Sequence, residues 1–137
     1  YFQFIEQTGG QAHLTFRTAA VEPKLAALQY ILDDAGGKAE VWIVCSEWWN
    51  RWPIRYLALP HPGVCVPEPQ DIDASDDYRR ALAEGRVWFV EFCNSQAERQ
   101  VKSQMAGRKA AYRQFLDYSG RPLLGVLHPT PMGSKNQ

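Results

Sequence analysis

The sequence predicts a single α/β domain, in which a mixed sheet of four to five strands is flanked by two main helices. Apolar runs of strand length recur along the chain, and two longer stretches have the apolar spacing of helices, with Gly or Pro residues between them. The 137 residues are enough for one compact core, and 45% of them are hydrophobic. Strands that alternate with helices favour a sheet covered by helices.

We expect this domain to occupy residues 11–129. The chain opens with Tyr1-Phe2-Gln3, which is typical of the end of a protease-site tag, so we expect residues 1–10 to be a tag remnant or a disordered lead. Residues 130–137 are mostly polar and are expected to form a frayed tail.

The first half of the domain is expected to contain two or three strands and one helix. Alternating residues predict a short strand over Gln11–Arg17. Leu and Ile residues on one face predict a helix over Pro23–Ala35, and the apolar run Val41–Cys45 predicts a buried strand. Ile54–Leu59 is a candidate further strand, and the prolines of residues 60–73 predict a loop.

A β-hairpin is expected next along the chain. Tyr78–Leu82 and Val87–Cys93 flank a short connection in which Gly85 would take the positive-φ position. A short helix over Asp77–Ala83 is the competing interpretation, because several of its residues are good helix formers.

The last part of the domain predicts a long helix and a final strand. Ser95 can cap a helix that runs to about Tyr118, and Glu98 three residues later completes a capping-box pattern. Apolar residues at helical spacing support this interpretation. Leu123–Leu127 is expected to be the final short strand.

Composition and charge limit the class of function. Lys plus Arg and Asp plus Glu each number 15, so the net charge gives no general attraction to nucleic acid, and only a local basic patch could provide one. The three cysteines are scattered, which is typical of reduced thiols in a cytoplasmic protein. No apolar run approaches the ~18 residues of a membrane span, so we expect no membrane association.

Glu91 is the first candidate functional residue. Side chains alternate along the predicted strand, so Glu91 shares a face with Phe89, and a carboxylate in so apolar a strand is costly without an ion, an arginine or water beside it. The predicted hairpin would bring Asp77 toward the same end of the sheet. Two such carboxylates form a hard oxygen site of the kind that holds Mg²⁺ or Mn²⁺, which would activate water for attack on a phosphodiester.

These residues resemble part of a known family. Asp77-Tyr78 and Gly85–Cys93, followed by Arg108–Arg113 at a predicted helix end, are similar to the core of PD-(D/E)xK restriction-endonuclease-like nucleases, and particularly to the endonuclease subunit of heteromeric transposases. The resemblance covers Glu22 to about Pro129 in the order of elements. It implies a restriction-endonuclease-like fold that acts on DNA or RNA phosphodiesters.

The resemblance also implies roles for single residues. In that family an acidic residue on an early helix, an Asp that opens a hairpin and a Glu-x-Lys on the next strand share one metal site. The matching positions here are Glu22, Asp77 and Glu91. Asp76 replaces the proline before the Asp, and Cys93 replaces the lysine, whose positive charge a thiol cannot supply. Either Lys102 on the following helix reaches in instead, or the protein does not cut.

Each acidic residue also has a purely structural interpretation. Glu91 could form an ion pair with Arg99 or Arg108 under a loop. Asp77 could cap a helix or belong to a turn. Glu22 could be a first-turn carboxylate that the helix dipole favours.

Two further patterns predict binding surfaces. One face of the predicted long helix would carry four cations, either along a phosphate backbone or as an ordinary solvated face. These cations are Arg99, Lys102, Lys109 and Arg113. A tryptophan-rich segment would stack bases, fill a partner's pocket, or cap a small core. Its residues are Trp42, Trp48, Trp49 and Trp52.

The sequence therefore supports two functional hypotheses. The first is a metal-dependent endonuclease in which Asp77 and Glu91 hold Mg²⁺ or Mn²⁺, while Glu22 and Lys102 assist. The second is a catalytically inactive module of the same fold, which binds a protein partner or nucleic acid through the tryptophans and the basic helix face.

Overall fold

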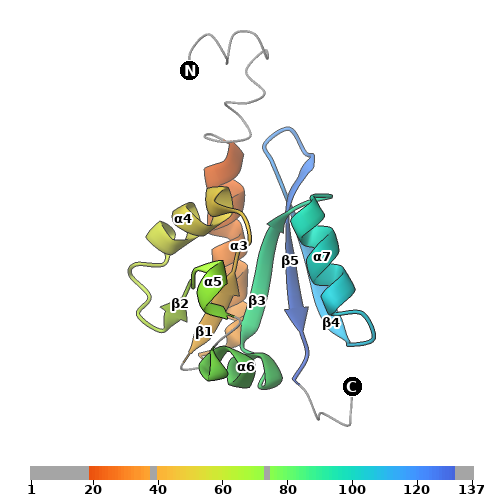
Figure 1. Cartoon of the computed structure of the whole chain (residues 1–137). Coiled ribbons are helices and arrows are strands. Elements are labelled where there is room, and N and C mark those ends of the chain that lie inside the picture. The colour runs from red at the N-terminus through yellow and green to blue at the C-terminus, as the bar shows by residue number, and fades with distance from the viewer. Residues whose placement is uncertain (1–18, 38–39, 73–74, 132–137) are drawn as a thin grey trace.

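The computed structural model describes residues 19–37, 40–72 and 75–131, and the structural statements below concern these residues. The described helices are α3 (Ala19–Ala35), α4 (Trp48–Leu57), α5 (Pro69–Ile72), α6 (Asp76–Ala83) and α7 (Gln96–Gln104). The described strands are β1 (Val41–Val44), β2 (Val64–Cys65), β3 (Val87–Phe92), β4 (Ala110–Leu116) and β5 (Pro122–Pro129). All five strands join one sheet, so the predicted mixed α/β class is confirmed (Figure 1).

The sheet has the strand order β2-β1-β3-β5-β4. β1 pairs in parallel with both β2 and β3, whereas β5 runs antiparallel to β3 and β4 runs antiparallel to β5. In the register between β3 and β5, Glu91 lies opposite Gly125. The carboxyl ends of the parallel neighbours β1 and β3 therefore meet at one end of the sheet.

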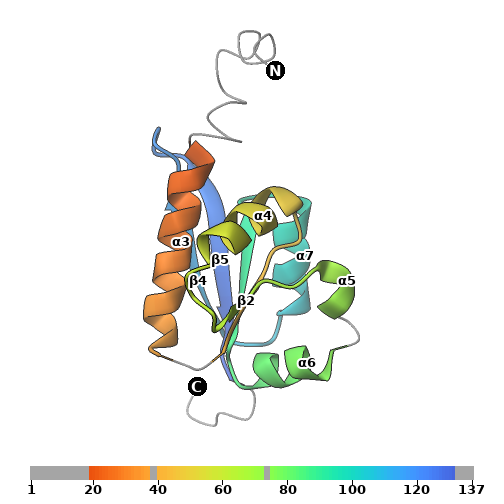
Figure 2. The same ribbon diagram turned by 90° about the vertical axis from the view of Figure 1, so that its left-hand side faces the viewer.

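Helices cover both faces of this sheet, with α3 on one side and α7 on the other (Figure 2). α3 and α4 pack against a cluster that contains Ile43 and Trp88, and α6 and α7 pack against one that contains Val44 and Phe89. β1 and β3 are thus buried on both faces, which explains why their sequences are almost continuously apolar.

Several predicted elements are confirmed. The helix predicted from Pro23 to Ala35 is α3, and the strands predicted over Val41–Cys45, Val87–Cys93 and Leu123–Leu127 are β1, β3 and β5. The strand predicted over Gln11–Arg17 and the lead over residues 1–10 lie outside the described residues.

The strand predicted over Ile54–Leu59 is wrong, because most of this segment belongs to α4. The two buried residues of α4, Asn50 and Ile54, are four positions apart, which is the spacing of one helix face. The predicted loop over residues 60–73 contains the short strand β2 and the single turn of α5.

The predicted hairpin is also wrong, and the competing helix is confirmed as α6. Ser75 caps this helix, since its side chain accepts a hydrogen bond from the backbone N–H of Tyr78 at 3.1 Å. Asp76 and Asp77 occupy the first turn, where the helix dipole favours carboxylates. Gly85 has the predicted positive φ, at 75°, but it turns the chain from α6 into β3.

The predicted long helix is replaced by α7 and β4. Ser95 does cap α7, and its hydroxyl accepts from the Glu98 backbone N–H at 3.1 Å. The helix ends at Gln104, and Gly107, with φ 83°, lies in the turn that leads into β4. Pairing with β5 then draws Tyr112 and the residues beside it into the sheet. Tertiary pairing therefore overrides the local helical pattern.

Candidate functional site

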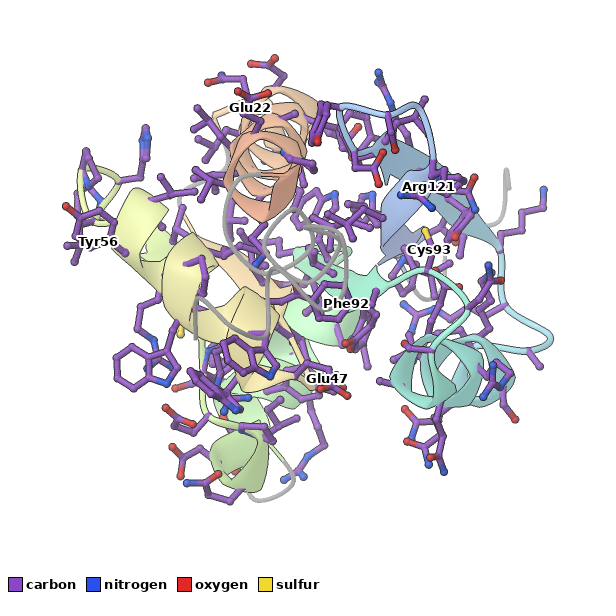
Figure 3. The ribbon with its side chains drawn as sticks, turned by 90° about the horizontal axis from the view of Figure 1, so that it is seen from above. Glu22, Glu47, Tyr56, Phe92, Cys93 and Arg121 are labelled. Carbon is purple, nitrogen blue, oxygen red and sulfur yellow. The ribbon has the colours of Figure 1, made fainter. Side chains whose placement is uncertain are left out.

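One candidate site lies where the chain leaves β1 and β3. From β1 it continues into α4 on one face of the sheet, and from β3 it continues into α7 on the opposite face. Ligands of open α/β sheets bind at such switch points between parallel neighbours. Figure 3 looks onto this end of the sheet, where Phe92 ends β3 and Glu47 precedes α4.

Glu91 is the central side chain of this end and is only 1% exposed. Its carboxylate accepts hydrogen bonds from the Ser46 backbone N–H at 3.1 and 3.2 Å and from the Ser46 hydroxyl at 2.7 Å. Burial raises the pKa of Glu91 to about 7, although the bonds from Ser46 oppose the shift, and the charges of Glu47 and Glu98 raise it further. A carboxyl with this pKa exchanges its proton near neutral pH.

Glu98 forms the second half of the site. It is 5% exposed, and its carboxylate accepts from the Asn94 backbone N–H at 2.9 Å and from the Tyr112 hydroxyl at 2.7 Å. Lys102 Nζ lies 3.5 Å from Glu98 Oε1 and 4.1 Å from the centre of the Tyr112 ring. These contacts give the buried carboxylate of Glu98 the hydrogen-bond and ion-pair partners that it needs. We call Ser46, Glu91, Asn94 and Glu98 the switch-point cluster.

Gly125 makes room for this arrangement. A Cβ at this position would collide with Glu98 Oε2 and would lie 2.6 Å from the Tyr112 hydroxyl. Because Gly125 is the partner of Glu91 across the sheet, the two acidic side chains are neighbours above β3 and β5. The glycine is therefore required by close approach of side chains.

Two unusual polar groups lie on the α3 and α4 side. Lys24 is 2% exposed, and its ammonium donates to the Trp49 carbonyl at 2.6 Å. Burial lowers the pKa of Lys24 to about 8. Asn50 is completely buried, and neither polar atom of its side chain has a hydrogen-bond partner among the described residues. Such an orphaned amide costs folding free energy.

The structure does not bring Asp77 to Glu91. Asp77 is exposed on α6, 3.5 Å from Arg80. α6 lies at the amino end of β3, whereas Glu91 is near the carboxyl end of that strand (Figure 1). Glu22 is exposed on the outer side of α3 (Figure 3). Only the predicted hairpin, which does not form, would have carried Asp77 to the end of the sheet where Glu91 lies. Of the three acidic residues predicted to share a metal site, only Glu91 therefore belongs to the switch-point cluster.

The predicted basic stripe is divided between two elements. Arg99 and Lys102 lie on α7, and Arg99 donates to the Asn94 carbonyl at 2.7 Å. Lys109 just precedes β4 and Arg113 lies on it, with the Arg113 guanidinium 4.9 Å from the Tyr30 ring of α3. These four cations therefore do not form one helix face.

Sequence reasoning missed the partner of Glu91. The predicted arginines bind elsewhere: Arg99 as above, and Arg108 at the carbonyls of Leu82 and Thr130. Ser46 stands 45 positions before Glu91, and only its place between a buried strand and the next segment could have indicated a role. Glu98 was recognised only as a helix-capping residue.

The predicted tryptophan segment forms α4, and its aromatic residues face outward. Trp48, Trp49 and Trp52 are 50%, 41% and 54% exposed, and Tyr56, one turn further along, is 73% exposed. Trp48 and Trp49 stack with their ring centroids 4.1 Å apart. Trp42 instead lies in the core with Val44.

Comparisons with known proteins give no relative. No family model, curated protein or solved structure matches this chain. Within residues 19–37, 40–72 and 75–131, no three or more His, Cys, Asp or Glu side chains group as a metal site would require. In that same part of the chain no helix has the length and apolar character needed to span a bilayer.

Proposed function

We propose that this chain is a protein-binding domain and that α4 carries its binding surface. The surface consists of Trp48, Trp49, Trp52, Tyr56 and Leu59, and we call it the α4 aromatic surface. The observation that supports the proposal is the exposure of these five large side chains, from 41% to 73%, along one helix and the residues just after it.

The sequence of α4 explains why these side chains point outward. Asn50 and Ile54 turn inward and hold the helix on the sheet. Trp48, Trp52 and Tyr56 are spaced four positions apart, so they line a different side of the helix, which is exposed. Trp and Tyr are enriched at the energetic centres of protein interfaces, and apolar side chains that gather on a surface mark interaction sites. The α4 aromatic surface has this composition.

A protein partner fits this surface better than nucleic acid does. The two arginines of α4 are engaged within the chain, since Arg51 and Arg55 lie 3.2 and 3.0 Å from Glu68. Arg55 also donates to the Val66 carbonyl. Because the two arginines of α4 are so engaged and the formal net charge is zero, the chain offers little attraction for phosphates beside the tryptophans.

A small hollow at the end of α4 supplies a place for a partner side chain. It has a volume of about 300 Å³ and is lined by Tyr56, Leu57, Leu59 and Pro60. These residues offer apolar walls, so an aliphatic or aromatic side chain of the partner would bury its surface there.

Site-directed photo-crosslinking in cells tests the proposal. A photoreactive phenylalanine derivative replaces Trp52, and the control replaces Tyr118, which is similarly exposed at 61% but lies in the turn between β4 and β5. We expect a protein adduct of one defined mass from position 52 and none from position 118. Adducts with nucleic acid or lipid, or equal yields at both positions, would refute the proposal.

A phosphodiester-cleaving enzyme of the PD-(D/E)xK type is a second candidate, and Glu91 is the residue that favours it. Its buried carboxyl lies at the carboxyl end of β3, and its pKa of about 7 suits proton transfer. Metal binding, a restriction-endonuclease-like fold and cleavage all stay predictions. Plasmid and single-stranded substrates with Mg²⁺ or Mn²⁺ test them, with Glu91→Ala and Cys93→Lys as variants. Absence of metal-dependent cutting would count against this candidate.

A further inference from the structure

A pocket of about 460 Å³ lies on the α6 and α7 side of the sheet, apart from the α4 aromatic surface. Val44, Phe89 and Val101 are apolar residues of its lining, and Ser46, Gln100 and Gln104 are polar ones. None of its lining residues carries a formal charge at neutral pH. Its volume is within the range of small-molecule sites, and its lining combines apolar walls with polar side chains.

Ser46 determines what kind of group the pocket can bind. When Glu91 is ionised, the Ser46 hydroxyl donates its only proton to Glu91 Oε2 at 2.7 Å. The remaining lone pairs of the hydroxyl oxygen can only accept, so a ligand must bring an N–H or O–H group to this point.

The charges around Glu91 select a cation among such ligands. Glu47 at the start of α4 and Glu98 on α7 act on Glu91 with the same sign, and the nearby Cys45 thiol is neutral because burial raises its pKa. Lys102 lies beside Glu98. Arg51 donates to the carbonyls of Cys45 and Ser46, and Lys24 donates to the Trp49 carbonyl. The Arg51 guanidinium is thus directed at backbone carbonyls, whereas the charged group in contact with the Ser46 hydroxyl is the Glu91 carboxylate.

We propose that this pocket binds a small primary amine with an apolar body, whose ammonium group donates a hydrogen bond to the Ser46 hydroxyl in front of the Glu91 carboxylate. The apolar body lies between Val44, Phe89 and Val101. This role is independent of partner binding through α4, because the pocket and the α4 aromatic surface share no residue.

Three ligands of equal length test the charge preference on the unmodified chain. Hexylamine, hexanol and hexanoate are titrated separately at pH 8, where Glu91 is ionised, while the backbone amide signals are followed by NMR. We expect hexylamine to give saturable shifts at Ser46, Phe89 and Gln100, with an affinity about tenfold higher than that of hexanol, because its hydrogen bond is charge-assisted. Hexanoate should give no saturable shift.

Variants then locate the site. Ser46→Ala and Glu91→Gln should each reduce the affinity for hexylamine about tenfold, to that of hexanol, while Ser103→Ala on the exposed side of α7 leaves it unchanged. Ala97→Leu should abolish binding of both ligands by filling the pocket. Equal affinities for the three ligands, shifts confined to other residues, or unchanged binding by Ala97→Leu would overturn the proposal, and the comparison of ligands needs no variant to fold.

Discussion

Replacing Glu91 by glutamine should stabilise the protein at alkaline pH. The carboxyl has a pKa of about 7 in the folded chain, against an ordinary value of 4.5. The folded state therefore holds this proton more tightly than the unfolded state, and the free energy of unfolding falls as the pH rises from 4.5 through 7. A glutamine at this position would keep the bonds with Ser46, because its amide oxygen can accept from the backbone N–H and its amide nitrogen can donate to the hydroxyl.

The size of the effect follows from that displacement of the pKa. A tenfold change in proton affinity corresponds to about 1.4 kcal/mol, so the ionised Glu91 costs the folded state about 3 kcal/mol above about pH 8. Glu91→Gln should remove most of this cost at pH 8 and change little at pH 4. The difference between the two chains therefore grows with pH.

Urea unfolding at pH 4, 6 and 8 measures this difference. Glu22→Gln serves as the control, since Glu22 is exposed on α3 and surface substitutions usually change stability by less than about 0.5 kcal/mol. A variant Glu91→Gln that is less stable than the unmodified chain at pH 8, or a difference that does not depend on pH, would refute the reasoning about burial.

Three further stability predictions concern other groups. Gly125→Ala should destabilise the protein by about 2 to 4 kcal/mol in urea unfolding, because the added Cβ separates Glu98 from the Tyr112 hydroxyl, whereas Tyr112→Phe should cost only about 1 to 3 kcal/mol. Asn50→Leu should raise the melting temperature, as it removes an orphaned buried amide worth about 1 to 3 kcal/mol. Lys24→Met should abolish the increase in stability between pH 8 and 10.5 that follows from its lowered pKa, about 3 kcal/mol in all.

Gly125→Ala with unchanged stability would mean that Glu98 and Tyr112 do not approach this backbone so closely. A destabilised Asn50→Leu would show that the amide of Asn50 is satisfied. A slope between pH 8 and 10.5 that persists in Lys24→Met would assign that titration to another group.

The sequence predicted the elements whose patterns are local and strong. The helix that became α3 and the strands β1, β3 and β5 were correct, because apolar spacing alone identifies them. The exposed tryptophans were also recognised as a candidate surface. What failed was the distinction between helix and strand at half-apolar segments, namely α4, α6 and β4. For β4, pairing with β5 decides the outcome, and no local pattern reports that pairing.

The candidate site shows the same limit. Glu91 was identified because a carboxylate in an apolar strand requires a partner, and this part of the reasoning was local. Its actual partner Ser46 lies on another strand end, and the position of Asp77 depended on a hairpin that does not form. Residues brought together by topology can be identified only once the strand order is known.

The central claim is that α4 carries a protein-binding surface. The most direct test purifies the crosslinked partner and measures its binding to variants of this chain. Isothermal titration calorimetry compares the unmodified chain with Trp52→Ala and with Tyr118→Ala, which truncates a similarly exposed aromatic residue in the turn between β4 and β5. If α4 carries the interface, Trp52→Ala loses about 2 kcal/mol or more of binding free energy and Tyr118→Ala loses almost none. Equal affinities of the two variants and the unmodified chain would contradict the claim.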